Sequence, residues 1–155
     1  MVALVTLSGC GDDCSGTRVC SGSYLVDSSR DMEVIGRCES VSGDLEIAGH
    51  PWFASVELSC LRSVGGDLLI HDAEVVDDPD SFSPTEVVIP SLTRVELSAL
   101  ETVDGDLTID NADLLGFLDL SALQDVNRNL YLNVGLGSDD GMPLLTELDL
   151  TALIH

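Results

Sequence analysis

The most constraining feature of this sequence is an internal repeat. Residues 95–109 (VELSALETVDGDLTI) agree at ten of fifteen positions with residues 56–70 (VELSCLRSVGGDLLI). Related segments occupy residues 33–47 and 118–132, and a fifth copy begins at residue 148. The copies start 23, 39, 23 and 30 residues apart, which indicates a 23-residue unit that carries insertions of 16 and 7 residues.

Apolar residues recur at fixed positions of this unit. The third position holds Ile35, Leu58, Leu97, Leu120 and Leu150, and the ninth holds Val41, Val64, Val103 and Val126. A spacing of two in "VEL" and "LTI" is typical of β-strands that turn alternate residues inward. Each unit therefore predicts two short strands joined by corners, too small to bury their own apolar edge unless units stack about 4.8 Å apart. The sequence predicts an all-β fold, a right-handed β-solenoid or β-helix of about 23-residue turns.

Three copies place a glycine just before the second predicted strand. These residues are Gly43, Gly66 and Gly105, and the fourth copy has Arg128 and Asn129 there instead. Because glycine adopts positive φ at little cost, we expect tight corners with positive φ at the glycines and a reshaped corner in the fourth copy.

The charge balance limits the classes of partner. The chain has 28 acidic residues against six basic ones, for a formal net charge of −22. Such a surface repels phosphate backbones and anionic membranes, so we expect no nucleic-acid binding. Two interpretations remain: the charge keeps the protein soluble, or the surface collects divalent cations. Only 4% of the residues are aromatic, which predicts an aliphatic core.

The first residues resemble an export signal. A short apolar run ends in "LSGC", which resembles the lipobox of bacterial lipoproteins and implies that Cys10 is lipidated. We therefore expect a signal-peptide remnant at 1–9, a lipidated tether and N-terminal cap at 10–31, and the solenoid at 32–155. No Lys or Arg precedes the short apolar run, which a late start codon or a truncation would explain.

The remaining cysteines predict disulfides rather than a metal site. They are Cys14, Cys20, Cys38 and Cys60. Four cysteines in an exported chain allow three complete pairings, and their spacing does not choose among them. No CxxC motif occurs and the three histidines are isolated in the sequence, so we expect no zinc site.

At this point the pattern resembles the receptor L domain, the leucine-rich-repeat-like β-helix module of insulin-receptor-type ectodomains. The shared signature is a cysteine, a polar stretch, a second cysteine and V-x-G-x-L-x-I, as in residues 19–47. The likeness covers roughly residues 19–153. It implies a Cys20–Cys38 disulfide that caps the N-terminal end. Cys60 aligns with alanines, which favours a buried free thiol; Cys14 is then unpaired, or pairs with Cys60 if the tether folds back.

The long insertion is the first candidate ligand site. Residues 71–94 offer an acidic cluster beside an apolar anchor, formed by Asp77, Asp78, Asp80 and Phe82. Long loops on a rigid scaffold commonly carry binding residues, although a passive cover for one face is an equal alternative. The only tryptophan, Trp52, aligns with Leu114 at a core position of the family, so we expect it to pack rather than to serve as an exposed recognition ring.

A second set of acidic residues is a weaker candidate for a metal site. The second position of the unit holds Glu57, Glu96, Asp119 and Asp149. If units stack directly, these like charges face one another, and Ca²⁺ can bridge carboxylates of this kind. Solvated carboxylates screened by salt are the favoured interpretation.

No catalytic motif stands out, so we do not expect an enzyme. We expect an exported, lipid-anchored protein at the cell envelope or outer surface, acting as a binding or adhesion module for an extracellular protein or glycan. The alternative is a structural envelope protein with an acidic, cation-interacting face. The sequence stops within the fifth copy, so the chain continues, was cut, or meets another subunit edge to edge.

Overall fold

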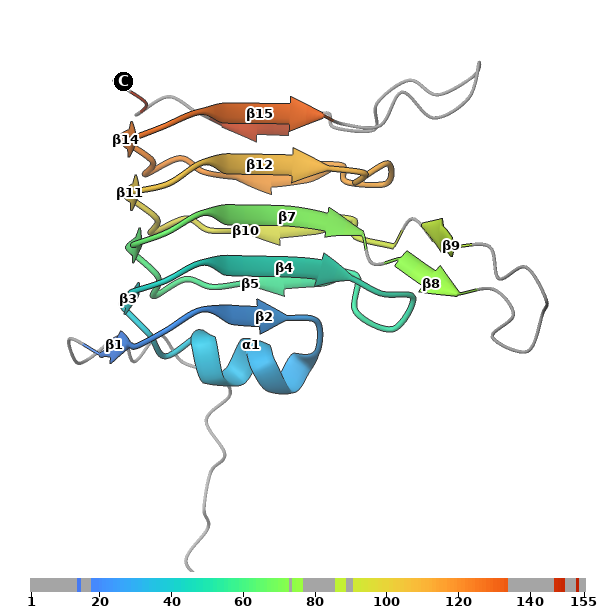
Figure 1. Cartoon of the computed structure of the whole chain (residues 1–155), viewed down its shortest axis with the longest axis horizontal. Coiled ribbons are helices and arrows are strands. Elements are labelled where there is room, and N and C mark those ends of the chain that lie inside the picture. The colour runs from blue at the N-terminus through green and yellow to red at the C-terminus, as the bar shows by residue number, and fades with distance from the viewer. Residues whose placement is uncertain are drawn as a thin grey trace, which may run out of the picture.

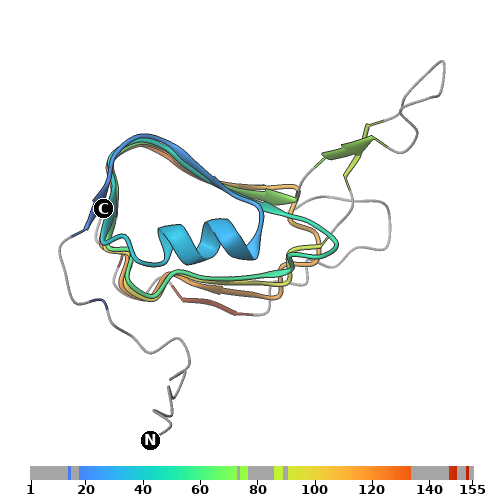
Figure 2. The same ribbon diagram turned by 90° about the horizontal axis from the view of Figure 1, so that it is seen from below.

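The fold is built from parallel strands stacked one unit above another (Figure 1). The computed structural model describes residues 14, 18–72, 74–76, 86–88, 91–133, 147–149 and 153. Each unit contributes short strands to three parallel sheets, which enclose one apolar core. Seen along the stacking direction, successive units overlie one another (Figure 2).

Each repeat unit contributes at most one strand to each of the three parallel sheets. The corner sheet contains β1 (Val19–Cys20), β3 (Ser40–Val41), β6 (Ser63–Val64), β11 (Thr102–Val103) and β14 (Asp125–Val126). The long sheet contains β2 (Tyr24–Val26), β4 (Leu45–Gly49), β7 (Leu68–Asp72), β12 (Leu107–Asp110) and β15 (Leu130–Asn133). The facing sheet contains β5 (Ser55–Glu57), β10 (Arg94–Glu96), β13 (Phe117–Asp119) and β16 (Glu147–Asp149). A separate antiparallel hairpin joins β8 (Glu74–Val76) and β9 (Glu86–Val88).

The register confirms the alignment of the repeats. Leu68 pairs with Leu45 and Leu107, and Ile70 pairs with Ile47 and Ile109. In the corner sheet Val64 pairs with its counterparts in the units on either side. These columns are almost fully buried, so identical positions of successive units meet inside the core. The sheets begin at Val19, upstream of residue 32, where the sequence places the start of the repeat body.

The predicted fold class is wrong. The described residues form a mostly-β molecule with three parallel sheets, an antiparallel hairpin and one short helix, and not the all-β, right-handed β-solenoid of two-strand turns. The ninth position, expected at a corner, forms strands of its own because its main-chain groups pair with the units on either side. The segment that begins the first copy is helical instead of extended.

The helix α1 (Ser29–Ile35) replaces the strand that the first copy predicts. Ser28 caps it, because its side chain accepts a hydrogen bond from the Asp31 amide, and Asp31 lies in the first turn, where a negative charge suits the helix dipole. The hydrogen bond from the Ser28 hydroxyl lowers the pKa of Asp31. The helix lies across the end of the core (Figure 2). The Glu57 amide of the edge strand β5 is 3.5 Å from the Met32 sulfur of the helix. The helix therefore covers a sheet edge that would otherwise be open to pairing.

The corner glycines are needed for close approach and not for positive φ. Among the described glycines only Gly22 has a positive φ, of 104°, so the prediction for Gly43, Gly66 and Gly105 is wrong. A Cβ on Gly66 would lie 2.9 Å from the Gly43 carbonyl carbon, and one on Gly105 would lie 2.6 Å from that of Gly66. Stacked corners approach too closely to leave room for a side chain.

A row of side chains beside these glycines links each unit to the next. Its members, here called the corner ladder, are Ser23, Asp44, Asp67, Asp106 and Asn129. The Asp67 amide donates to Asp44 Oδ1 at 2.9 Å, and the Asp106 amide donates to Asp67 Oδ1 at 2.8 Å. Each side chain except that of Asn129, the last member, thus accepts the main-chain N–H of the equivalent residue one unit further on. The ladder ties successive corners together in register.

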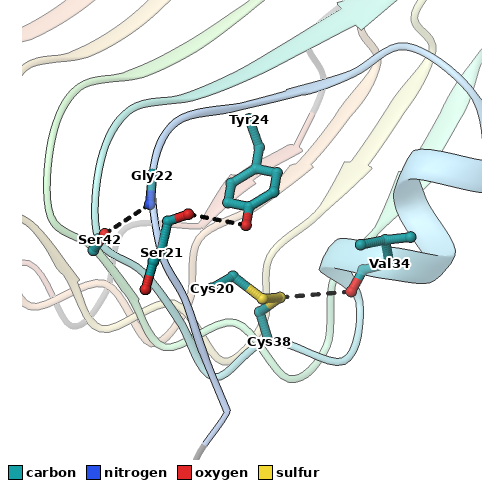
Figure 3. The surroundings of a disulfide bond; sticks show 7 residues. All are labelled: Cys20, Ser21, Gly22, Tyr24, Val34, Cys38 and Ser42. Atoms are coloured by element: carbon teal, nitrogen blue, oxygen red, sulfur yellow. Dashed lines mark hydrogen bonds between the residues drawn. A yellow bond between two sulfur atoms is a disulfide. The ribbon is translucent and has the colours of Figure 1, made fainter.

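Two disulfides close the N-terminal region. One joins Cys20 to Cys38, the pair that the family resemblance implies, with the Cα atoms 5.8 Å apart. Cys38 Sγ lies 3.5 Å from the Val34 carbonyl oxygen of α1 (Figure 3). The other joins Cys14 to Cys60, with the Cα atoms 5.3 Å apart, so the expectation of a free Cys60 thiol is wrong and the alternative pairing is the one present. Both Cα separations fall in the range usual for disulfides.

Candidate functional site

The candidate functional site is one edge of the molecule, at which the chain passes from the long sheet to the facing sheet. The turn after β4, the hairpin β8–β9 and the turn after β12 all project there, at the right of Figure 1. We call the described residues of these connections, 49–54, 72, 74–76, 86–88, 91–93 and 110–116, the loop edge. At the opposite edge the corner sheet joins successive units through tight turns. Among the described connections, those that differ in length therefore lie on one side of the body, and loops of this kind commonly carry binding residues.

The turn His50–Phe53 presents an exposed aromatic ring. Trp52 is 74% exposed, whereas the next residue, Phe53, is 4% exposed and packs into the core. The prediction that Trp52 packs is therefore wrong. Its alignment with Leu114 does hold, but Leu114 is itself half-exposed and the core position belongs to the following residue, Leu115.

Main-chain and ring contacts fix this turn. The Phe53 amide donates to the His50 carbonyl at 2.8 Å, and the His50 amide donates to the Phe53 carbonyl at 3.2 Å. The His50 and Trp52 rings stack with their centroids 4.8 Å apart and their planes within 5°. His50 Nε2 lies 3.9 Å from the Asp27 carboxylate at the end of β2. The indole is thus presented by an ordered support that also includes a carboxylate.

Asp72 fastens the base of the insertion. Its side chain is 1% exposed, and Oδ1 accepts hydrogen bonds from the amides of Ser91 at 2.9 Å and Leu92 at 2.7 Å. One carboxylate thereby joins the residue at which the insertion leaves β7 to the residues at which the chain returns. Opposite Asp72, a Cβ on Gly49 would lie 2.8 Å from Leu92 Cβ, so only glycine leaves room for this arrangement.

The environment of Asp72 disfavours its charge. Asp72 Oδ2 and Asp113 Oδ1 are buried, and neither has a hydrogen-bond partner among the described residues. Burial raises the pKa of Asp72, and the nearby Asp113 raises it further, while the two amide hydrogen bonds act in the opposite direction. Asp72 was not among the predicted site residues. The signal was a carboxylate in the register position that Gly49 holds in the preceding unit.

The candidate ligand residues of the insertion, Asp77, Asp78, Asp80 and Phe82, lie outside the described residues, as does Cys10. What the structure describes there is the antiparallel pairing of β8 with β9, in which Glu74 is opposite Val88. The insertion therefore begins and ends as a hairpin rooted at Asp72.

The acidic column of the facing sheet is aligned as the repeat predicts. Glu96 pairs with Glu57 on one side and with Asp119 on the other, and Asp119 pairs with Asp149. Other groups engage two of these carboxylates: Arg94 Nη2 lies 2.8 Å from Glu96 Oε2, and Asp119 Oδ1 accepts from the Ser121 amide at 2.9 Å. In the part of the chain that the structure describes, no three His, Cys, Asp or Glu side chains gather as metal ligands.

None of the helices described is long and apolar enough to cross a membrane. Comparison of the chain with protein-family models, curated proteins and solved structures found no significant match. The case for function therefore rests on the geometry of the loop edge.

Proposed function

We propose that this chain is a non-catalytic binding or adhesion module of the cell envelope, and that the loop edge carries its binding site. The observation that carries the proposal is Trp52, a large aromatic side chain that a rigid turn holds in solvent. Tryptophan is among the residues that dominate binding energy at protein interfaces, and a preorganised ring loses little conformational entropy on binding. The ligand in this proposal is an extracellular protein or a glycan.

Independent features support the proposed location. Two disulfides suit an oxidising compartment outside the cytosol. The "LSGC" sequence supports export and lipidation at Cys10, so that a lipid attaches the module to a membrane. The repeat phrase and the Cys20–Cys38 pair support kinship with receptor L domains as part of the same proposal.

The alternative is a structural envelope protein whose acidic face interacts with divalent cations. The observation in its favour is the column of the facing sheet, in which Glu57, Glu96 and Asp119 meet one strand apart. Like charges opposite one another are unfavourable unless a counter-ion screens them. A rise in melting temperature with added Ca²⁺, abolished by Glu57→Gln, would favour this alternative.

Two measurements test the binding proposal. The first is protease treatment of intact cells that express the full chain: loss of the domain, while a periplasmic control survives, places it on the outer surface.

The second compares wild type, Trp52→Leu and Tyr131→Leu for binding to an array of extracellular proteins and glycans. Tyr131 is a matched control because it is an exposed aromatic residue on β15, away from the loop edge. Selective loss of binding in Trp52→Leu is expected, and equal binding by all three proteins would refute the proposal.

A further inference from the structure

Folding does not account for the position of Trp52. It is the most exposed large hydrophobic residue among those described, at 74% against 60% for Val19 and 52% for Tyr131. Its neighbour Phe53 already fills the core position beneath the turn. The indole therefore adds little to the core, while it leaves apolar surface in water. A role outside folding is the remaining reason for its placement.

The support beneath the ring favours a ligand above it. The His50 imidazole covers one face of the indole, with 4.8 Å between the ring centroids, and the exposure of Trp52 leaves the other face to solvent. An indole face carries a partial negative charge and attracts cations within about 6 Å of the ring centroid. The Asp27 carboxylate lies 3.9 Å from His50 Nε2 and brings an acidic side chain to the same turn.

The charge of the whole protein selects the same kind of partner. A net charge of −22 repels anionic ligands and draws cationic ones toward the surface. Elsewhere, this chain already pairs a cation with an aromatic ring on its surface: the Arg94 guanidinium carbon lies 3.8 Å from the centroid of the Phe117 ring. A guanidinium from another molecule could occupy the open face of Trp52 in the same manner.

We propose that the turn His50–Phe53 docks a cationic side chain, arginine or lysine, from a basic segment of a partner polypeptide. This inference rests on the binding function proposed above and names the chemistry of its ligand. Trp52 supplies the face on which the cation stacks, His50 holds the ring in place, and Asp27 supplies the counter-charge.

The test uses the fluorescence of Trp52, which is the only tryptophan in the chain and therefore reports on this turn alone. The full chain is titrated at pH 8 with a glycine peptide that contains one arginine, and with the same peptide carrying citrulline, the uncharged isostere. The arginine peptide should give a saturable change and bind about two- to fivefold more tightly than the citrulline peptide. Salt at about 0.5 M should remove most of that preference, because exposed charges are then screened.

Three variants, measured by calorimetry, keep the inference falsifiable. Trp52→Leu should lose binding and Tyr131→Leu should retain it, while both melt like wild type. Asp27→Asn should weaken binding of the arginine peptide and leave the citrulline peptide unaffected. Equal affinity for the two peptides, or undiminished binding by Trp52→Leu, would overturn the inference.

An uncharged oligosaccharide, titrated in parallel, distinguishes failure of this inference from failure of the proposed binding function. Saturable, salt-independent sugar binding that Trp52→Leu abolishes, with no preference for arginine, would replace the cationic partner by a glycan. It would leave the binding function intact. If Trp52→Leu also binds the protein and glycan array as wild type does, both proposals fail together.

Discussion

Replacing Asp72 by asparagine should stabilise the protein at neutral pH, although it weakens two hydrogen bonds. Asparagine retains an oxygen that can accept from the amides of Ser91 and Leu92. The change from charged to neutral acceptor costs about 1 kcal/mol for each bond. Against this stands the penalty of a buried carboxylate, which is several kcal/mol for each ion. The raised pKa of Asp72 shows that burial and Asp113 outweigh the hydrogen bonds, so the net effect of neutralisation favours the folded state.

Asp72→Asn should therefore raise the free energy of unfolding at pH 7, because it removes a carboxylate whose charge burial disfavours. The amide NH₂ also replaces Oδ2, an acceptor that no described donor reaches. Asp72→Ala should act in the opposite direction and cost about 2–4 kcal/mol, because it removes an acceptor that two buried amides share.

The pH dependence gives the sharper assay. The folded-state pKa of Asp72 lies above its unfolded value, so the penalty is fully present above the folded pKa and disappears as the pH falls toward 3.8. Urea unfolding of wild type and Asp72→Asn should therefore differ most at pH 7 and converge near pH 4. Asp104→Asn, an exposed carboxylate, is the control and should change stability by less than about 0.5 kcal/mol at either pH. A destabilised Asp72→Asn, or a difference that does not depend on pH, would refute the reasoning.

Three further changes probe the scaffold. Asp67→Ala removes the acceptor for the Asp106 amide and should cost about 1 kcal/mol more stability than Asp67→Asn, which keeps an acceptor. Equal stabilities of the two variants in denaturant would mean that water replaces the lost hydrogen bond. Gly66→Ala should cost about 1–3 kcal/mol through overpacking of the stacked corners, measured by thermal unfolding, and an unchanged melting temperature would contradict the close approach. Cys14→Ser removes a cross-link that spans 46 residues and should cost about 4 kcal/mol in the chain-entropy model. If the variant and wild type unfold at the same denaturant midpoint, the Cys14–Cys60 bond does not constrain the unfolded chain.

The periodicity of the sequence was enough to predict which residues meet in the core. Leu68 and Ile70 stack on their counterparts because a spacing of two fixes which face of a strand is buried, and the repeat length fixes the partner. What periodicity does not encode is the local competition between structures. The segment from Ser28 to Ile35 carries a helix cap and finds no strand of a preceding unit beside it, so a helix forms where the repeat predicts a strand.

The candidate site was harder to predict than the core. Trp52 and Phe53 are adjacent aromatic residues, and a one-residue difference in the alignment of a turn decides which of them is buried. Asp72 was missed because its role depends on main-chain amides that return to it from 19 and 20 residues further along the chain. The corner ladder depends likewise on contacts between units, which the "GD" pair at residues 43–44, 66–67 and 105–106 signals only once the register is known.

The corner ladder holds the strand register at one edge of the molecule, so that loops at the other edge are free to vary in length and sequence. Its hydrogen bonds fix the register at one edge, whereas the insertion of 16 residues enters at the loop edge, and the strand pairs before and after it keep their register. Segments exchanged at the loop edge therefore do not have to maintain the alignment of the strands. An engineer could graft foreign recognition loops between Asp72 and Ser91, or in place of the turn His50–Phe53, and leave the corners untouched. The same division would let related chains diverge in ligand while they retain one scaffold.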